Sequence, residues 1–375
     1  MRKGPWNIGR MKIVKRGVGI LGLIMLLLLV LSLASGCASE EGNGVEDGTA
    51  TTSKASEEGP EAFYEGKNVT FVVPYEPGGG YDIYARLVSQ YLEEALQATV
   101  LVRNMPGGQT YLANRYVYEA DPDGLTLMIA DSQAMIMNQL TAADIGEGID
   151  VREYEWLGRI SAEPAVLTTS KVAGIETVED LQAADYVRLG ATAVGSRAEM
   201  TESVVLEAMG LDGEVVVGFK GSSTSIMSAI KGEVDGIGGS ASSALDYAEQ
   251  PELAPLFFVS RETSPLFPDL PTIEEAADLD SEGMKWVDAL DTVTGVGRAL
   301  LTTPGVPEER VEFLRMTLGN VLQDEEFLAQ ADEISRPISY LSGAEIAESI
   351  NNLLGMPEEE AKELERVFLE KYVTQ

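Results

Sequence analysis

The sequence predicts an α/β fold in which mostly parallel sheets are flanked by helices. From Asn68 onward, short apolar runs rich in β-branched residues alternate with segments whose apolar residues recur at helical spacing. This order of strand, loop and helix is typical of a parallel sheet covered by helices. About 310 residues follow the N-terminal segment, and that length suits two domains of ordinary size.

The first 36 residues have the pattern of an export signal. An apolar run at 18–33 leads through three small residues into Cys37, the only cysteine, and no acidic residue comes before it. Six basic residues precede the run: Arg2, Lys3, Arg10, Lys12, Lys15 and Arg16. The small residues before Cys37 resemble a bacterial lipobox, although Ala34 stands where Leu is commoner. Met11 could serve as the start in place of Met1.

We therefore expect residues 1–36 to be a lipoprotein signal peptide and Cys37 to carry the lipid. The alternative is an uncleaved membrane anchor, because the apolar run approaches the ~18 residues that a membrane span needs. Both alternatives place the rest of the chain outside the cytoplasm. The first attaches it by lipid to the outer face of the cytoplasmic membrane.

The composition argues against most enzyme classes. The chain has no histidine, and a lipidated Cys37 leaves no free thiol. Ser-His and Cys-His pairs and histidine-based zinc sites are therefore excluded. We expect a protein that is not an enzyme and has no metal or cofactor; a hydrolase based on carboxylates is the weaker alternative.

The charge balance excludes nucleic acid as a partner. The chain has 27 basic and 61 acidic residues, a net charge of −34. Removal of the signal would leave 21 basic residues against 61 acidic ones, a net charge of about −40. Such a surface repels nucleic acid and anionic lipid headgroups.

The expected elements follow one another after a polar segment. Residues 37–64 are rich in Ser, Thr, Gly and Glu and should form a flexible tether. Strands are then expected at 69–73, 99–102, 125–130, 187–189, 215–217, 236–237 and 256–259. Helices are expected through 83–96 and 112–117, after Pro307 in a first-turn position, and from the capping-box spacing of Ser342 and Glu345.

Two glycine-rich loops follow the first two expected strands, at Pro77–Gly80 and Pro106–Gly108. In open α/β sheets, ligands bind at the carboxyl ends of strands, where such loops lead into helices. Glycine lets the backbone approach a ligand closely, and the N-terminus of a helix attracts anions. The loops predict a carboxylate or phosphate site that needs no Arg or Lys.

Longer segments resemble a known family. Val73–Arg86 resembles the first signature of the tripartite tricarboxylate transporter receptors, the Bug family, and Val102–Gly108 with Asp121–Leu127 resembles the second. Further matches lie at Gly195–Ser196, Phe219–Gly221, Gly232–Asp235 and Ser264–Thr272. The resemblance extends, in order, over nearly the whole chain after the tether.

The resemblance implies a type II periplasmic-binding-protein fold, with two lobes, a hinge crossed twice and a ligand cleft between the lobes. Lobe 1 would comprise 65–167 and 290–375, and lobe 2 would comprise 168–289. The implied function is capture of a small di- or tricarboxylate-like organic acid and its delivery to the permease subunits of a membrane transporter. A ligand sensor for a signalling partner is the alternative.

The resemblance also implies the ligand contacts. In lobe 1 they would be Tyr75, Gly78, Gly79, Gly80, Asp82, Gly107, Gly108, Gln109 and Thr110. In lobe 2 they would be Thr192, Gly195, Ser196, Lys220 and Gly221. From the residues alone, a structural role in the first turn of a helix, where an acid favours the dipole, is stronger for Asp82 than a catalytic pair with Asp235. A surface role is slightly stronger for Lys220 than ligand contact.

Three departures from the family pattern leave the ligand open. Gln109 and Thr110 stand where more glycines are usual, Gly239 stands where an acid is often found, and Glu199 replaces an expected histidine. Glu199 could enter the site and select a cation-bearing ligand such as an amino acid. It could instead form a capping box with Ser196, whose spacing fits that motif.

Overall fold

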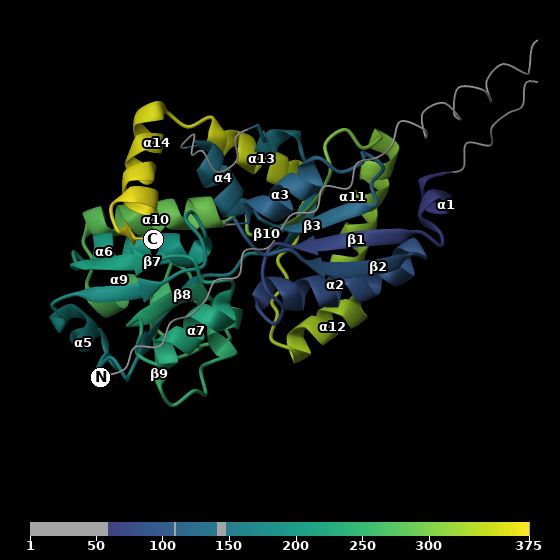
Figure 1. Cartoon of the computed structure of the whole chain (residues 1–375). Helices are drawn as coiled ribbons and strands as arrows, with labels where there is room; N and C mark the ends of the chain where they lie inside the picture. The colour runs from purple at the N-terminus through teal and green to yellow at the C-terminus, as the bar shows by residue number, and fades with distance from the viewer. Residues whose placement is uncertain (1–58, 109, 141–147, 375) are drawn as a thin grey trace, which may run out of the picture. The chain divides into compact units, whose positions relative to one another are not determined.

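The computed structural model describes residues 59–108, 110–140 and 148–374, which form two six-stranded sheets with helices on their faces (Figure 1). The expected α/β class and the expected two lobes are confirmed. The expected signal peptide, Cys37, most of the tether and Gln109 lie outside the described residues. No helix within the described ranges combines the length and apolar character that a membrane crossing requires.

The first lobe is built on a sheet with the strand order β11-β4-β10-β3-β1-β2. Its strands are β1 (Asn68–Val73), β2 (Thr99–Asn104), β3 (Thr126–Asp131), β4 (Glu155–Ser161), β10 (Arg298–Thr302) and β11 (Leu341–Ser342). Its helices are α1 (Pro60–Tyr64), α2 (Gly80–Leu96), α3 (Tyr111–Tyr118), α4 (Ser132–Leu140), the short η2 (Val151–Glu153), α11 (Glu308–Leu322), α12 (Glu325–Glu333) and α13 (Gly343–Leu354). The Ser342–Glu345 capping box at the start of α13 is confirmed.

The second lobe is built on a sheet with the strand order β12-β7-β6-β8-β5-β9. Its strands are β5 (Ala165–Ser170), β6 (Val187–Gly190), β7 (Gly213–Val216), β8 (Gly236–Ser240), β9 (Leu253–Val259) and β12 (Val373–Thr374). The helices that follow or accompany them are α5 (Val178–Ala183), α6 (Arg197–Ala208), α7 (Ser222–Ile230), α8 (Ala241–Leu245), α9 (Ile273–Ala277), α10 (Ser281–Thr294), α14 (Glu358–Glu365) and η3 (Arg366–Glu370).

Both sheets are more mixed than the mostly parallel ones predicted. β1 pairs in parallel with β2 and β3, whereas β10 is antiparallel to β3 and β4. In the second sheet β6, β7, β8 and β12 form parallel pairs, whereas β5 is antiparallel to β8 and β9. β4, β5 and β10 carry the chain from one sheet to the other, so they need not follow the βαβ crossovers that produce parallel strands.

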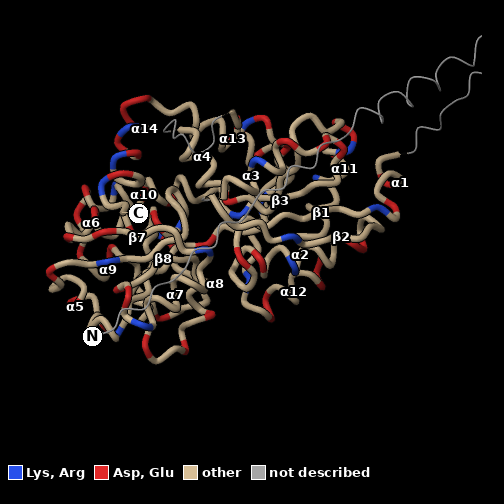
Figure 2. Tube along the Cα trace, viewed as in Figure 1, with Lys and Arg blue, Asp and Glu red and all other residues tan. Residues whose placement is uncertain are grey.

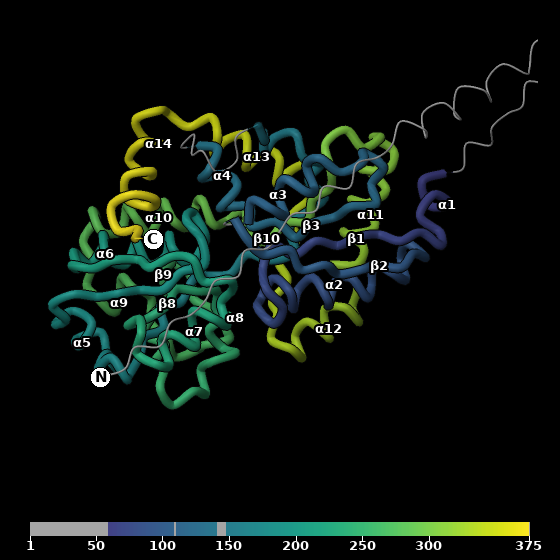
Figure 3. The backbone as a smooth tube through the Cα atoms, viewed as in Figure 1, coloured from purple at the N-terminus to yellow at the C-terminus, as the bar shows by residue number. Residues whose placement is uncertain are grey.

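The C-terminus lies in the second lobe, which differs from the expected assignment of 290–375 to lobe 1. The Val215 amide donates to the Tyr372 carbonyl at 2.7 Å, and β12 thereby pairs with β7. The pairing covers what would otherwise be an exposed sheet edge. The backbone therefore passes between the lobes three times, after β4, after α10 and after α13, rather than twice (Figure 3).

Apolar cores fill both lobes. Acidic residues are distributed along the backbone of both lobes (Figure 2). One core packs the first sheet against α2, α11 and α12 through residues such as Phe71, Leu92 and Phe327. A second core runs on from the first lobe into the other, from Ile136 to Trp286. This continuous packing keeps the ends of several helices from both lobes close together.

Candidate ligand-binding site

A cavity of about 80 Å³ lies where the two lobes meet. It exceeds the ~10–15 Å³ that one water molecule needs, so it has room for more than one water-sized group. Its first-lobe lining consists of Tyr75, Gly79, Gly80, Tyr81, Asp131 and Arg298. Its second-lobe lining consists of Thr192, Ser196, Arg197, Ala198, Gly221, Ser222, Gly238, Gly239, Ser240 and Ser243.

The first turns of α2 and α7 form part of the wall. The N-cap is Gly79 for α2 and Gly221 for α7, and neither glycine has a side chain that could cap the first turn. The Gly221 amide itself donates to the Thr224 Oγ1 at 3.3 Å. The first amides of a helix lack intrahelical acceptors and carry the positive end of its dipole. The two helix N-termini therefore place the positive ends of their dipoles at the cavity, an arrangement that suits an anion.

Glycine is needed where the lobes approach each other. A Cβ atom on Gly79 would lie 3.1 Å from the Ser222 Oγ. A Cβ atom on Gly80 would lie 2.9 Å from the Ser243 Oγ and 3.2 Å from the Arg298 Nη2. The first glycine-rich loop thus allows the helix start of one lobe to close against the serines of the other.

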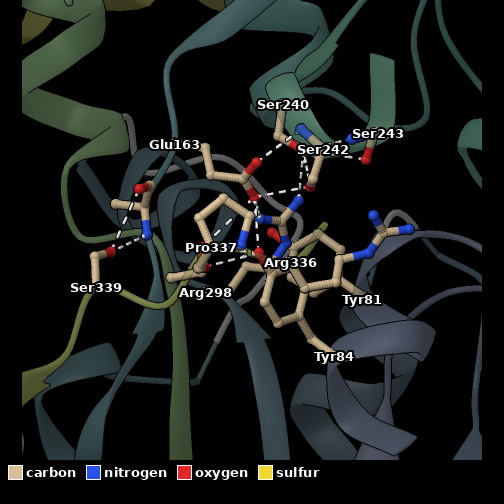
Figure 4. Close-up of polar contacts among 12 residues, drawn as sticks. Tyr81, Tyr84, Glu163, Ser240, Ser242, Ser243, Arg298, Arg336, Pro337 and Ser339 are labelled. Atoms are coloured by element: carbon tan, nitrogen blue, oxygen red, sulfur yellow. Dashed lines mark hydrogen bonds and ion pairs between the residues drawn. The ribbon is translucent and has the colours of Figure 1, made fainter. Parts of the chain in front are cut away.

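Arg298, on β10, is buried beside the cavity and links the lobes. Its Nη1 is 2.7 Å from the Glu163 Oε1, and its Nη2 donates to the Ser240 Oγ at 2.8 Å. Figure 4 shows this carboxylate and guanidinium facing each other, with Ser240 and Ser242 approaching them. Burial by itself would raise the pKa of Glu163, but Arg298 and the Ser242 amide outweigh it and hold that pKa below its usual value.

Arg197, at the start of α6, is held by main-chain oxygens. Its Nη1 donates to the Glu163 carbonyl at 2.7 Å and its Nη2 to the Thr294 carbonyl at 3.0 Å. These carbonyls belong to two of the segments that pass between the lobes. Burial and the neighbouring Arg298 lower the pKa of Arg197. Within the described ranges, Arg197 forms no ion pair with a carboxylate.

Asp131, the last residue of β3, brings a buried acid to the same cavity and is 1 % exposed. Its Oδ2 accepts a hydrogen bond from the Tyr75 hydroxyl, and its Oδ1 accepts one from the Ala134 amide at 3.3 Å. Burial raises the pKa of Asp131, although these hydrogen bonds and the two arginines oppose the rise.

The structure brings six of the expected contact residues to the cavity: Tyr75, Gly79, Gly80, Thr192, Ser196 and Gly221. Seven others do not line it: Gly78, Asp82, Gly107, Gly108, Thr110, Gly195 and Lys220. The second glycine-rich loop leads into α3, where Thr110 is the N-cap in the left-handed region at φ 74°. Its glycines, Gly107 at φ 127° and Gly108 at φ 55°, permit this turn.

Asp82 and Lys220 have structural contacts of their own. The Asp82 carboxylate accepts from the Gly78 amide, the Arg86 guanidinium and the Asn104 side chain, each at 2.9 Å. These contacts hold the first glycine-rich loop against the start of α2 and the end of β2. The Lys220 side chain is 74 % exposed and lies 3.9 Å from the Glu76 carboxylate. Both observations agree with the roles that the residues alone favoured.

Glu199 is fully buried and does not line the cavity. Its amide donates to the Ser196 Oγ at 3.4 Å, which confirms Ser196 as the N-cap of α6. The return bond of the expected capping box is different, because the Glu199 Oε2 accepts from the Gly195 amide at 2.9 Å rather than from Ser196. Gly195 adopts φ 72°, a left-handed conformation that glycine favours. Burial raises the pKa of Glu199 to about 8.

Several lining residues were not predicted from the sequence, above all Arg197, Arg298 and Asp131, whereas Tyr81 lies within the expected contact range 78–82. Asp131 could have been predicted, because it directly follows the expected strand 125–130 and ligands in open α/β sheets bind at the carboxyl ends of strands. Arg298 had no such signal. Its strand returns from the other lobe, so its side chain reaches the site from a distant part of the sequence.

Comparison with known proteins gives consistent results. Residues 84–294 match the family described as "Tripartite tricarboxylate transporter family receptor". A UPF0065 protein from the TAR-I ttuE-ttuC' intergenic region of Agrobacterium vitis is 26% identical over 233 residues, which is 60% of this chain and 65% of the relative. Protein BugT of Bordetella pertussis is 23% identical over 217 residues, 56% of this chain and 66% of that protein. The chain thus spans about two thirds of the length of these relatives.

Solved structures share the fold. The periplasmic binding protein BugD has a TM-score of 0.64 at 18% identity, with 80% of this chain and 98% of that chain covered. MatC from Rhodopseudomonas palustris, solved with bound malate, has a TM-score of 0.65 at 17% identity and covers 80% and 98%. Rpa4515 of R. palustris, solved with adipate, has a TM-score of 0.65 at 23% identity and covers 80% and 97%. The chain belongs to the tripartite tricarboxylate transporter receptor family.

Proposed function

We propose that this receptor captures a small carboxylate outside the cytoplasm and delivers it to the permease subunits of a tripartite tricarboxylate transporter. One observation carries the proposal. The inter-lobe cavity is lined by the first turns of α2 and α7 together with Arg197 and Arg298.

The two arginines contribute differently to anion binding. Glu163 compensates the charge of Arg298, so this side chain mainly offers a fixed hydrogen-bond donor. Arg197 is bound by neutral carbonyls, and its positive charge is left for a ligand. A buried cation beside helix N-termini stabilises a carboxylate by charge-assisted hydrogen bonds, which are stronger than neutral ones.

The remaining parts of the proposal rest on the sequence and on relatives. A cavity of about 80 Å³ favours a small acid, and the similar proteins MatC and Rpa4515 were solved with malate and adipate. The basic and apolar N-terminus and the lipobox-like residues before Cys37 support export and a lipid anchor. Delivery to a permease is supported by the description of the family.

Titration calorimetry on the full-length protein in detergent tests the function. Succinate, malate, adipate and citrate serve as probes, with glucose and maltose as uncharged controls. We expect at least one acid to bind and to raise the unfolding temperature, because a ligand at 100 times its Kd adds about 2.7 kcal/mol of stability. Binding of the sugars alone would overturn the proposal.

A further inference from the structure

An acidic side chain lies in the wall of a cavity that otherwise suits an anion. Asp131 is almost completely buried and lines the same cavity as Arg197 and the first turns of α2 and α7. A second carboxylate brought close to it would be repelled, since like charges in a buried site interact strongly. The position of Asp131 therefore restricts which carboxylates can fill the whole cavity.

Within the described ranges Asp131 has no direct ion-pair partner, although the charges of Arg197 and Arg298 act to lower its pKa. Arg298 directs its Nη1 and Nη2 to Glu163 and Ser240, and Arg197 directs its own to two carbonyls. Among residues 59–108, 110–140 and 148–374, no Lys or Arg forms an ion pair with Asp131. The arginines therefore compensate the carboxylate only without direct contact, and a ligand that supplies the opposite charge in direct contact would stabilise it further.

The carboxylate also retains capacity to accept hydrogen bonds. Its two oxygens offer about four acceptor positions. The described contacts, from the Tyr75 hydroxyl and the Ala134 amide, are one to each oxygen. The unused positions would accommodate the N–H donors of a cationic group.

The aromatic neighbours of Asp131 also favour a cation. The rings of Tyr75 and Tyr81 are 4.9 Å apart, and both residues line the cavity. Aromatic faces attract an ammonium group through the ring quadrupole. A metal ion is a poorer occupant, because no group of three or more acidic, histidine or cysteine side chains converges anywhere in the described parts of the chain.

We infer that the ligand is a zwitterionic amino acid, whose ammonium group pairs with Asp131 while its carboxylate binds Arg197 and the first turns of α2 and α7. The inference rests on the proposed carboxylate function and specifies its ligand class. Asp131 is thus the residue that selects an aminated acid over the same acid without the amino group.

Matched pairs of acids test this inference on the full-length protein in detergent. The pairs are succinate and L-aspartate, glutarate and L-glutamate, adipate and L-2-aminoadipate, and butyrate and L-2-aminobutyrate. We expect the aminated member of at least one pair to bind ten or more times more tightly, which corresponds to about 1.4 kcal/mol. This comparison uses the wild-type protein alone and does not depend on any variant folding.

Asp131→Asn should reduce the preference for the aminated acid to less than threefold, because the amide has no charge to pair with an ammonium group. Asp235→Asn is the matched control. Asp235 also accepts a backbone hydrogen bond, from the Arg188 amide at 2.7 Å, but it does not line the cavity. The control should keep the full preference.

The outcomes separate the two proposals. If acids without the amino group bind as tightly as their aminated partners, the inference about Asp131 is overturned and the carboxylate function stands. The inference is equally overturned if folded Asp131→Asn keeps the full preference. If no acid of either kind binds, the carboxylate function itself fails.

Discussion

Glu163 and Arg298 form a buried ion pair at the point where the chain passes between the lobes. The Glu163 Oε1 and the Arg298 Nη1 are 2.7 Å apart, and the two side chains are 2 % and 7 % exposed. Glu163 lies in the connection from β4 to β5, and Arg298 begins the strand that returns to the first sheet. The pair also contacts Ser240 and Ser242, so it joins the two connections to the second lobe.

Removing one partner of this pair should destabilise the protein strongly. Glu163→Gln leaves the Arg298 guanidinium buried without a counter-charge, and breaking a buried pair in this way costs about 3–5 kcal/mol. The free energy of unfolding from urea titrations measures the loss. The double variant Glu163→Gln with Arg298→Met should recover part of it, because no buried charge is left unpaired. A double variant less stable than the single one would contradict this explanation.

Glu199 should make stability depend on pH. Burial raises its pKa in the folded protein to about 8 from an ordinary value of 4.5. The folded state therefore holds a proton that the unfolded state releases, and stability falls as pH rises from about 4.5 to about 8, by up to about 1.4 kcal/mol per pH unit. Urea denaturation at several pH values measures this slope. Glu199→Gln should reduce the slope, and the remainder should come partly from neighbouring Glu202, whose pKa burial also raises.

A control for that measurement is Glu179→Gln, at an exposed position on α5. It should leave the slope unchanged. A Glu199→Gln variant that retains the full wild-type slope would show that Glu199 is already ionised in the folded protein at neutral pH.

Gly80→Val should weaken ligand binding by at least tenfold, or about 1.4 kcal/mol. The new Cβ would lie within 2.9 Å of the Ser243 Oγ, so the lobes could not close as they do in this structure. Calorimetry gives the affinity, and circular dichroism checks the fold. Gly59→Val is the control, because a Cβ at Gly59 has no neighbour within 4 Å. Unchanged affinity in folded Gly80→Val would place the ligand elsewhere.

Ligand affinity should change little between low and high salt. At about 1 M salt the screening length is only ~3 Å, which removes long-range repulsion from the acidic surface while contacts inside a closed cavity persist. Lys220→Ala should likewise leave the affinity within twofold, because the Lys220 side chain is mostly exposed and outside the cavity. A steep fall in affinity with salt would indicate an exposed ion pair in the site.

Local sequence patterns were sufficient for the elements that depend on neighbouring residues. The apolar, β-branched run at Val69–Val73 and the N-cap at Ser342 are local patterns, and the structure has the expected strand and the expected helix start there. The first glycine-rich loop was identified because glycine, strand end and helix start occur together in the sequence. Strand pairings between distant parts of the sequence could not be predicted from local patterns. β10 and β12 join sheets whose other strands are far away in the sequence, so no local pattern reveals their partners.

The same difference between local patterns and distant pairings determines which site residues could be predicted. Gly79 and Gly80 lie in a glycine-rich loop directly after a strand, so the local pattern predicted them, whereas Tyr75, Thr192 and Ser196 were predicted from the family resemblance. Arg298 enters the cavity because β10 lies beside β3, a pairing of residues more than 160 positions apart. The glycine loops suggested a purely anionic ligand. The charge pattern of the assembled cavity is visible only in three dimensions.

The pairing of β12 with β7 places the two ends of the folded unit in different lobes. Tyr64 of α1 stacks on Phe313 in the first lobe, with ring centres 5.6 Å apart, whereas Val373 pairs with Val215 in the second sheet. Fluorophores attached near Pro60 and after Thr374 would therefore report the separation of the lobes directly. Immobilising the protein by either end would hold one lobe and leave the other to move. Labels at the two ends of the folded unit would therefore allow a single-molecule measurement of the distance between the lobes.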